Sequence, residues 1–197
     1  MGEHNLRNAV AAIALLAEGF NLPVAQLARA LLDFKGVKRR QELVATAGGV
    51  RLYDDFAHHP TAVEETLRAM RGHHPGAKLI AVFEPRSATA CRNTHQAEYP
   101  AAFLPADLAL IAPVGRAEIA ADERLDVPAI VREVNARGGR AETVEPGPAS
   151  VDAIVARVAA EAGDGDVVAV LSNGAFGGIH GRLARALEAR AVAPSDG

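Results

Sequence analysis

Four short apolar runs, separated by longer amphipathic stretches, constrain the fold of this chain more than any other feature. The runs have the length and composition of buried strands, and the stretches between them favour helices. Strands that alternate with helices pair in parallel through right-handed crossovers, so the pattern predicts an α/β fold with a mostly parallel sheet and helices on both faces. The predicted strands cover residues 78–83, 108–112, 140–144 and 167–171, and the predicted helices cover residues 61–71, 94–104, 128–137, 150–162 and 179–190.

A β-hairpin and two helices are expected ahead of this alternating region. Gly48 and Gly49 separate two β-rich stretches, residues 42–47 and 50–55, and glycine readily adopts the positive φ of a tight hairpin turn. Apolar residues at helical spacing predict a short helical segment with helices at residues 8–18 and 23–33, and a charged, glycine-containing stretch at residues 35–40 predicts a linker to the hairpin.

The composition excludes several classes of function. The 197 residues include 21 Lys and Arg against 24 Asp and Glu, so the net charge of -3 provides no global basic surface for nucleic acid or an anionic membrane. The single cysteine, Cys91, excludes an intramolecular disulfide and fits a reducing cytoplasm. The longest apolar run near the start, residues 9–17, is too short to span a bilayer. We therefore expect a cytoplasmic protein, with no nucleic-acid or membrane partner, in which any anion site is local.

Polar residues suited to chemistry cluster directly after three of the predicted strands. In an open α/β sheet, ligands bind beyond the carboxyl ends of the strands, where the loops gather. The three segments are Asp-Asp-Phe-Ala-His-His-Pro at residues 54–60, Glu-Pro-Arg-Ser at residues 84–87, and Ser-Asn-Gly-Ala-Phe-Gly-Gly-Ile-His at residues 172–180. We expect these segments to surround a common site.

The first segment offers carboxylates and imidazoles. Asp54 and Asp55 can orient a ribose or a metal, or they can form a solvated turn, and their position at a strand end favours a ligand site. His58 and His59 can donate hydrogen bonds to a phosphate. Because adjacent side chains diverge and no His-Glu-x-x-His motif is present, we expect no metal site.

The other two segments and the charged linker can each bind an anion. Arg86 suits the bidentate capture of a carboxylate, although an exposed loop arginine is the alternative. Residues 172–174 allow backbone N–H groups to approach a ligand, and a structural glycine turn explains them equally well. Lys38, Arg39 and Arg40 can contact a nucleotide or remain solvated.

Taken in order, the three segments resemble the Mur ligases. Gly-Glu-His-Asn at residues 2–5 with Asn8-Ala9, and Arg40 before Glu42, extend the resemblance over nearly the whole chain. It implies a Rossmann-like C-terminal domain at residues 36–191, preceded at residues 1–35 by the last helices of a central ATPase domain and followed by a disordered tail at residues 192–197. The chain holds no Gly-x-x-x-x-Gly-Lys-Ser/Thr phosphate loop, so an N-terminal and a central domain are expected as missing partners.

The resemblance also implies an activity. Enzymes of this family phosphorylate a carboxylate with ATP and Mg²⁺, and an amine then attacks the acyl phosphate. For this chain the resemblance implies the C-terminal part of a ligase that joins UDP-N-acetylmuramate to the tripeptide L-alanyl-γ-D-glutamyl-meso-diaminopimelate in peptidoglycan recycling. ATP and Mg²⁺ would be held mainly by the missing domains, so the chain alone is expected to be inactive. The alternatives are L-alanine as the amine donor, or a non-catalytic module that binds a peptide or a nucleotide.

Site residues follow from the resemblance, position by position. It places Asn5 and Asn8 near adenine. Arg40 and Asp55 would hold the ribose, with Arg39 in place of Arg40 if the match slips by one residue. His58 would act at the reaction centre, together with Asp55. The tripeptide would be received by His59, Arg86, Ser87, Ser172, Asn173 and Gly174, and no metal ligand is assigned.

Overall fold

A mostly parallel sheet forms the centre of the molecule. The computed structural model describes residues 3–34, 37–116 and 118–192. Within these residues, six strands pair in the order β1-β2-β6-β3-β4-β5, and every neighbouring pair is parallel except β1 with β2. The predicted α/β sheet is therefore confirmed. The strands are β1 (Glu42–Ala47), β2 (Val50–Asp55), β3 (Leu79–Phe83), β4 (Leu108–Ile111), β5 (Ala141–Thr143) and β6 (Val167–Leu171).

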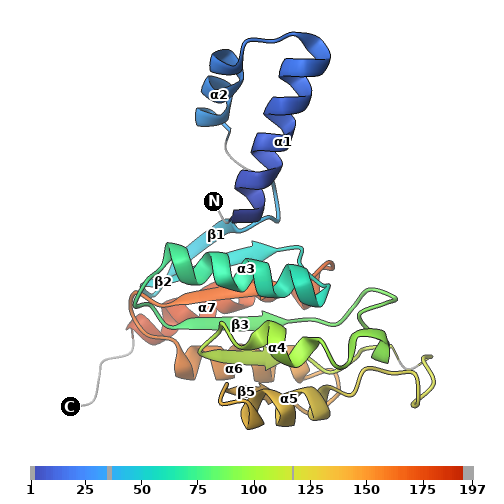
Figure 1. Cartoon of the computed structure of the whole chain (residues 1–197). Coiled ribbons are helices and arrows are strands. Elements are labelled where there is room, and N and C mark those ends of the chain that lie inside the picture. Colours follow the sequence, from blue (N-terminus) through green and yellow to red (C-terminus); the bar gives the residue numbers. More distant parts are fainter. Residues whose placement is uncertain (1–2, 35–36, 117, 193–197) are drawn as a thin grey trace.

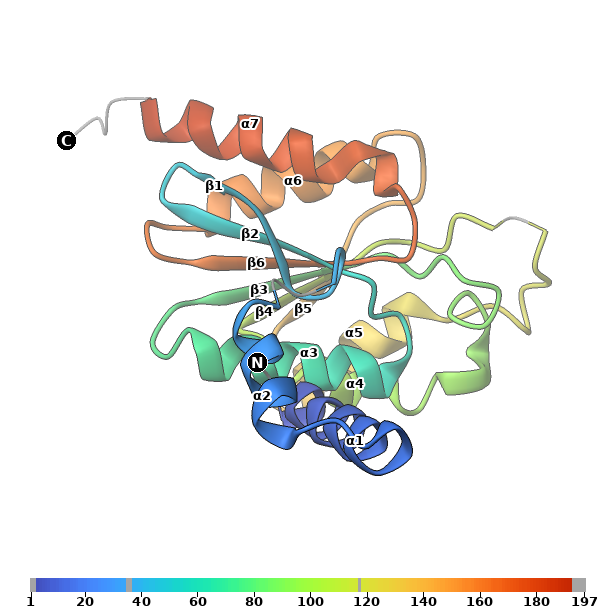
Figure 2. The same ribbon diagram turned by 90° about the horizontal axis from the view of Figure 1, so that it is seen from above.

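Helices cover both faces of this sheet. Side chains of α3, α4 and α5 pack on one face, and those of α6 and α7 pack on the other (Figure 2). Along β3, Ala81 faces the first group and Val82 the second, because side chains alternate along a strand. Burial on both faces explains why these strands read as continuous apolar runs. The helices are α1 (Glu3–Phe20), α2 (Val24–Leu32), α3 (Pro60–His73), α4 (Tyr99–Phe103), α5 (Val127–Ala136), α6 (Ser150–Glu161) and α7 (Ile179–Val192).

The turn between β1 and β2 requires glycine. Gly48 has a φ of +54° and Gly49 a φ of +79°, which is the conformation expected for the predicted hairpin. A Cβ atom on Gly48 would lie 2.3 Å from the carbonyl oxygen of Leu187 in α7. The turn therefore fits closely under α7, and this contact fixes the antiparallel edge of the sheet.

The helix predicted at residues 94–104 is wrong in its first half. A 3₁₀ turn, η1 (Asn93–His95), comes first, and only α4 is an α-helix. Pro100 explains the late start, because proline has no backbone N–H and is tolerated in the first turn of a helix but not in its interior. Tyr99 is 1% exposed, and its hydroxyl donates to the carbonyl oxygen of His58 at 2.7 Å. This bond anchors α4 to the first of the three polar segments.

The α1–α2 segment stands apart from the core of the sheet (Figure 1). The two helices contact each other, and no residue of α2 is buried. On α1, the apolar side chains of Leu6 and Phe20 are 60% and 69% exposed. This segment therefore buries little of its apolar surface within the chain.

The ends of several elements differ from the prediction by a few residues. The first helix, predicted at residues 8–18, begins at Glu3 and ends at Phe20. The predicted disordered tail overlaps α7 at Val192, and its other residues, 193–197, lie outside the described residues. Residues 35 and 36 of the predicted linker also lie outside them.

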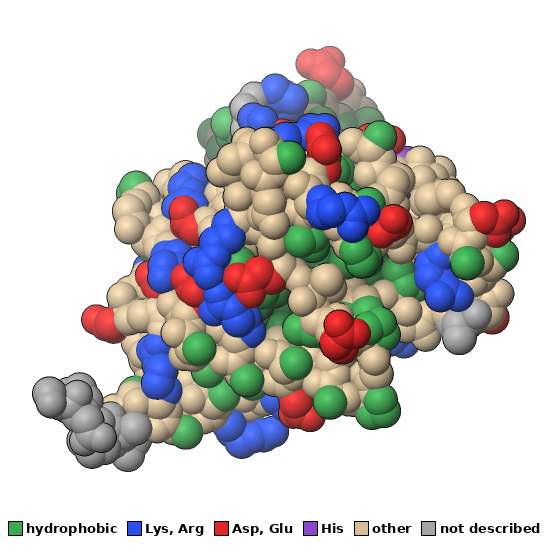
Figure 3. Space-filling model, turned by 90° about the horizontal axis from the view of Figure 1, so that it is seen from below, with side chains coloured by type: hydrophobic (Ala, Val, Ile, Leu, Met, Phe, Trp, Pro, Cys, Tyr) green, Lys and Arg blue, Asp and Glu red, His purple; other side chains and the backbone are tan. Residues whose placement is uncertain are grey.

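The surface mixes the two signs of charge. Basic and acidic side chains are interspersed on the face shown in Figure 3, in keeping with a net charge of -3. That face presents no continuous basic field of the kind that holds nucleic acid. None of the helices in the described residues combines the length and the apolar character that crossing a bilayer requires.

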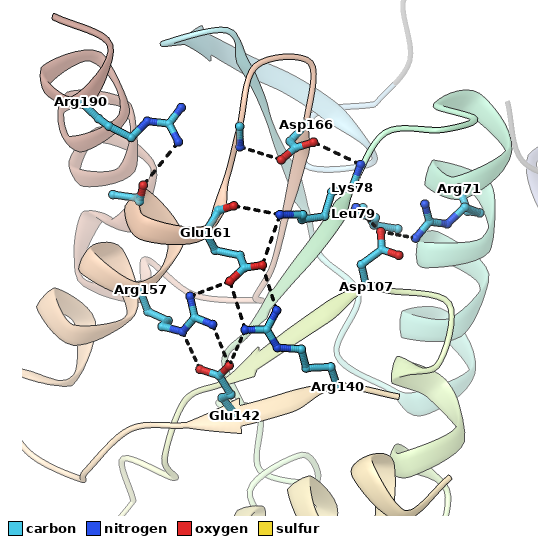
Figure 4. Close-up of polar contacts among 12 residues, drawn as sticks. Arg71, Lys78, Leu79, Asp107, Arg140, Glu142, Arg157, Glu161, Asp166 and Arg190 are labelled. Carbon is cyan, nitrogen blue, oxygen red and sulfur yellow. Dashed lines mark hydrogen bonds and ion pairs between the residues drawn. The ribbon is translucent and has the colours of Figure 1, made fainter. Parts of the chain in front are cut away.

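Charged residues hold α6 against the amino ends of the strands (Figure 4). Glu161, in the last turn of α6, accepts hydrogen bonds from Arg140 at 2.9 Å and from Lys78 at 3.2 Å. Arg157 forms a bidentate pair with Glu142 at 2.6 and 2.8 Å. The hydrogen bonds from these cations, that of Arg140 first, hold the pKa of Glu161 at about 2. Because Lys78 precedes β3 and Arg140 precedes β5, the network ties one helix to two strands at the edge opposite the polar segments.

Candidate functional site

Three neighbouring strand ends bring the polar segments together. β6 lies between β2 and β3, and all three run in the same direction. In the register of the sheet, Leu171 pairs with Asp55 on one side and with Phe83 on the other. The segments at residues 54–60, 84–87 and 172–180 therefore leave the sheet at one edge, as the sequence predicts.

A hydrogen bond between Ser172 and Glu84 joins two of these segments. Ser172 is fully buried; its hydroxyl donates to the carboxylate of Glu84 and accepts from the backbone N–H of Gly174 at 2.9 Å. The other carboxylate oxygen of Glu84 lies 3.8 Å from a guanidinium nitrogen of Arg86. Glu84 thus couples the loop after β6 to the one arginine predicted to bind substrate.

The approach of Arg86 to this loop depends on the absence of a side chain at position 174. A Cβ atom on Gly174 would lie 2.1 Å from Cδ of Arg86 and 2.3 Å from its Nε. The Arg86 side chain is 54% exposed, so its guanidinium is available to a carboxylate in solution. Of the other predicted substrate residues, Ser87 accepts a hydrogen bond from the N–H of Ala90 at 3.0 Å, and the buried Oδ1 of Asn173 has no hydrogen-bond partner among the described residues.

Arg39 fastens the linker to the same edge. Its Nε lies 3.1 Å from the carboxylate of Asp54, and its Nη2 donates to the carbonyl oxygens of Ser172 at 2.5 Å and Gly174 at 3.0 Å. The guanidinium also lies over the ring of Phe56, 5.1 Å from its centroid. The guanidinium of Arg39 is therefore engaged by other residues of the chain.

Asp55 is turned inward rather than toward solvent. It is 2% exposed, and its oxygens accept hydrogen bonds from the N–H groups of Ala57 and Gln41, both at 2.8 Å, and from the hydroxyl of Thr66 at 3.4 Å. Burial raises the pKa of Asp55, and the two backbone hydrogen bonds oppose that rise. Its carboxylate holds Gln41, which joins the linker to β1, together with the loop after β2 and α3.

A cavity of about 970 Å³ opens between the α1–α2 segment and the side of the sheet that carries β2 and α3. Asn5 and Asn8 line it from α1, and Arg40 lines it from the linker. Three of the predicted cofactor residues therefore share one cavity, whereas the fourth, Asp55, is not among its lining residues. The volume falls in the range of small-molecule sites. The other lining residues are Ala9, Ala12, Leu31, Phe34, Val37, Gln41, Tyr53, Met70, His73 and His74.

Two polar residues of this cavity pair with each other. Nε2 of His74 lies 3.0 Å from the hydroxyl of Tyr53, and the two rings are 5.4 Å apart. Burial, followed by the nearby charge of Arg51, lowers the pKa of His74, so its imidazole is neutral near pH 7. The pair can therefore offer both a hydrogen-bond acceptor and a donor to a ligand.

His58 and His59 point to different partners, as expected for adjacent residues. Nδ1 of His58 lies 3.0 Å from the carbonyl oxygen of Phe56, and the ring is half-buried. His59 is exposed and caps α3, where its Nδ1 accepts a hydrogen bond from the N–H of Thr61 at 3.3 Å. Local backbone contacts therefore hold each of the two imidazoles.

Comparison with known proteins identifies the family to which this chain belongs. The family described as "Mur ligase, glutamate ligase domain" matches residues 39–174, more than half of the chain. The chain belongs to the Mur ligase family. A curated relative of this Mur ligase chain is the UDP-N-acetylmuramate–L-alanyl-γ-D-glutamyl-meso-2,6-diaminoheptandioate ligase of Escherichia coli (strain K12), which is 41% identical over 202 residues, covering 98% of the chain and 39% of the relative. The UDP-N-acetylmuramate–L-alanine ligase of Acidovorax sp. (strain JS42) is 34% identical over 204 residues, covering 100% of the chain and 41% of the relative.

Solved structures of Mur ligases share the fold. A murein peptide ligase from Psychrobacter arcticus has a TM-score of 0.71 and 34% identity, over 95% of this chain and 38% of that one. The MurF ligase from Thermotoga maritima, solved in complex with ADP, has a TM-score of 0.65 and 16% identity, over 96% of this chain and 40% of that one. This Mur ligase chain spans about two fifths of the length of the relatives it matches.

Several residues of this Mur ligase site were not predicted from the sequence. Glu84 belongs to the Glu-Pro-Arg-Ser segment, which the sequence does indicate as part of the site. A carboxylate near an arginine, however, gives no reason to expect a separate function for it. Tyr53 and His74 carried no such signal, because a strand tyrosine and a loop histidine are common structural residues. Their shared position becomes visible only when β2 and the end of α3 line one cavity with α1.

Proposed function

We propose that this chain is the C-terminal part of an ATP-dependent ligase that joins UDP-N-acetylmuramate to L-alanyl-γ-D-glutamyl-meso-diaminopimelate through an acyl phosphate. The observation that carries the proposal is that Asn5, Asn8 and Arg40 line one cavity, while Arg86 stands at the sheet edge where the three polar segments meet. A relative whose name gives these two substrates is 41% identical over nearly the whole chain. Peptidoglycan recycling in the cytoplasm would be the setting of this reaction.

The proposal divides the chain into two parts. Residues 1–35 would be the last helices of a central ATPase domain, and residues 36–191 the C-terminal domain. The exposed apolar side chains of Leu6, Leu15 and Phe20 on α1 support this division, since they find no cover within the described residues. The sequence contains no phosphate loop, so the residues that bind the triphosphate and Mg²⁺ would belong to the missing domains.

Each group of residues would have a distinct task. Asn5 and Asn8 offer amide donors and acceptors for the edge of adenine, and Arg40 offers a cation for the ribose and phosphate side of the nucleotide. Arg86, held by Glu84 and framed by the 172–174 loop, would bind a carboxylate of the tripeptide. His58 would lie at the reaction centre, with Asp55 as the buried carboxylate that fixes the loop carrying it. Catalysis would then rest on positioning the amine against the acyl phosphate and on neutralising its charge.

The test is reconstitution with the missing domains. Phosphate release and formation of the amide product are measured with ATP, Mg²⁺, UDP-N-acetylmuramate and the tripeptide. We expect no turnover by this chain alone and turnover by the full-length enzyme that contains it. Phosphate release by the 197-residue chain alone would contradict the proposal that the missing domains are required. Absence of amide product from the full-length enzyme with the tripeptide would contradict the proposed substrate.

A second ligase function has L-alanine as the amine donor. It is favoured by the 34% identity, over the full chain, to an enzyme whose name gives L-alanine as the substrate. The two amines can be compared side by side in the full-length enzyme. A higher kcat/KM for L-alanine than for the tripeptide would decide in favour of this second function.

A further inference from the structure

We propose that His59, His95 and Glu98 form a binding site for a borderline divalent cation such as Zn²⁺. One potential ligand atom from each of these residues lies within 4.8 Å of the others. The imidazole rings of His59 and His95 are 4.4 Å apart and meet edge to face. The sequence did not indicate this site, because His95 lies far from His59 along the chain and no metal-binding motif joins them.

The backbone that carries the three residues is held on both sides. The Tyr99 hydroxyl donates to the carbonyl oxygen of His58, which binds the segment after η1 to the start of α3. Gln96 exchanges two hydrogen bonds with the backbone of Asp126, at 2.9 and 3.0 Å. Because these contacts already order the backbone that carries the ligands, less conformational entropy is lost when a metal binds, and preorganised ligands bind more tightly.

The donor atoms suit zinc better than magnesium. Nδ1 of His95 lies 2.9 Å from a carboxylate oxygen of Glu98, so these two ligand atoms already face each other, and a cation between them would take the place of the shared proton. Nδ1 of His59 makes only a long hydrogen bond to the N–H of Thr61, so either ring nitrogen is available at small cost. Two imidazoles and one carboxylate are a ligand set found in zinc sites, whereas Mg²⁺ prefers oxygen ligands alone.

The side chains need to move little to enclose an ion. Ligand atoms around a tetrahedral Zn²⁺ lie about 3.3 Å apart, given Zn–N distances near 2.0–2.1 Å. Glu98 is 54% exposed and can rotate toward the two rings without crossing the core. Three protein ligands leave one position of a tetrahedral ion open to water or to another ligand. This site is separate from the Mg²⁺ of the proposed ligase reaction and does not depend on it.

Zinc binding to the 197-residue chain tests the proposal. Titration calorimetry with Zn²⁺, and visible absorption with Co²⁺ as a tetrahedral probe, are compared for the wild type, His95→Gln, Glu98→Gln and the control His73→Gln. We expect one equivalent of bound Zn²⁺ in the wild type, a loss of affinity of about tenfold or more in His95→Gln and Glu98→Gln, and no change in the control. Circular dichroism without metal verifies that each variant is folded.

Two results would overturn the site. The first is the absence of stoichiometric binding by the wild type. The second is binding that His95→Gln and Glu98→Gln retain, or that His73→Gln weakens to the same extent, because the ion would then sit elsewhere. Binding should also weaken in acid, since protons compete with the metal for its ligand atoms.

Discussion

The hydroxyl of Ser172 donates to the carboxylate of Glu84 across the ends of two neighbouring strands, β6 and β3. Because Ser172 is fully buried and Glu84 also faces Arg86, this one bond sets the relative position of two segments of the candidate site. Hydrogen bonds to a charged acceptor contribute more to stability than neutral ones.

Replacing Glu84 with Gln should therefore weaken both the fold and substrate binding. The amide can still accept from Ser172, but the charge that attracts Arg86 is lost. We expect a loss of about 1–2 kcal/mol in the free energy of unfolding, measured by urea titration. Glu133→Gln removes an exposed carboxylate on α5 that pairs with Arg137, just after that helix, and should cost less than about 0.5 kcal/mol. Equal effects of the two substitutions would mean that the Glu84 bond is worth no more than a surface ion pair.

Gly174→Ala should displace Arg86 without unfolding the protein. The new Cβ would overlap the Arg86 side chain, which is flexible and exposed and can move away. In the full-length ligase, we expect the KM for the tripeptide to rise about tenfold or more while the KM for ATP stays within twofold. Gly72→Ala, whose Cβ would meet no atom within 4 Å, serves as the control and should leave both constants unchanged. A rise in the KM for ATP alone would show that the loop serves the nucleotide instead.

The neighbouring residues Arg39 and Arg40 should respond differently to truncation. Arg39→Ala removes hydrogen bonds to Asp54 and to two backbone carbonyl groups, so we expect it to destabilise the fold by about 1.5–3 kcal/mol. Arg40→Ala removes an exposed cation from the cavity and should leave the thermal midpoint nearly unchanged. In the full-length protein, Arg40→Ala should instead weaken ATP binding about tenfold, measured by calorimetry. If Arg39→Ala weakens ATP binding while the fold stays intact, the assignment of the two arginines must be exchanged.

The network around Glu161 should make stability depend on pH. The pKa of Glu161 is lowered to about 2 in the folded state from its ordinary value of 4.5, so its contribution is present above about pH 4.5 and disappears as the pH falls through about 2. Glu161→Gln should lower the free energy of unfolding by about 1–3 kcal/mol at pH 7. The gap between wild type and variant should shrink on acidification from pH 5 to pH 2. A difference in the free energy of unfolding that stays constant over that range would show that the ionised carboxylate is not what stabilises α6. Glu145→Gln, at an exposed loop residue, serves as the control.

The sequence was most informative where local chemistry decides the structure. The short apolar runs identified β3, β4, β5 and β6, and the pair Gly48-Gly49 identified the hairpin of β1 and β2 because few other residues adopt its positive φ. The helix predicted at residues 94–104 is wrong in its first half because Pro100, inside an apolar stretch, lies in the first turn of α4. Periodicity alone does not locate a proline-initiated helix.

The site was predictable in its position but not in its internal contacts. The rule that loops gather at the carboxyl edge correctly united the segments around Asp55, Arg86 and Ser172. It could not tell that Asp55 turns inward, or that Arg39 rather than Arg40 reaches the 172–174 loop, because such choices depend on which neighbour the fold places within hydrogen-bond distance. The pairing of His59 with His95 is another outcome of tertiary packing alone.

The contacts of Arg39 give the two walls of the cavity different attachments to the fold. Its backbone N–H donates to Glu42, its carbonyl oxygen accepts from Phe56 at 2.8 Å, and its guanidinium donates to the loop after β6. The wall that contains Arg40 and Tyr53 is thereby tied to the sheet, whereas the wall that contains Asn5 and Asn8 belongs to the α1–α2 segment.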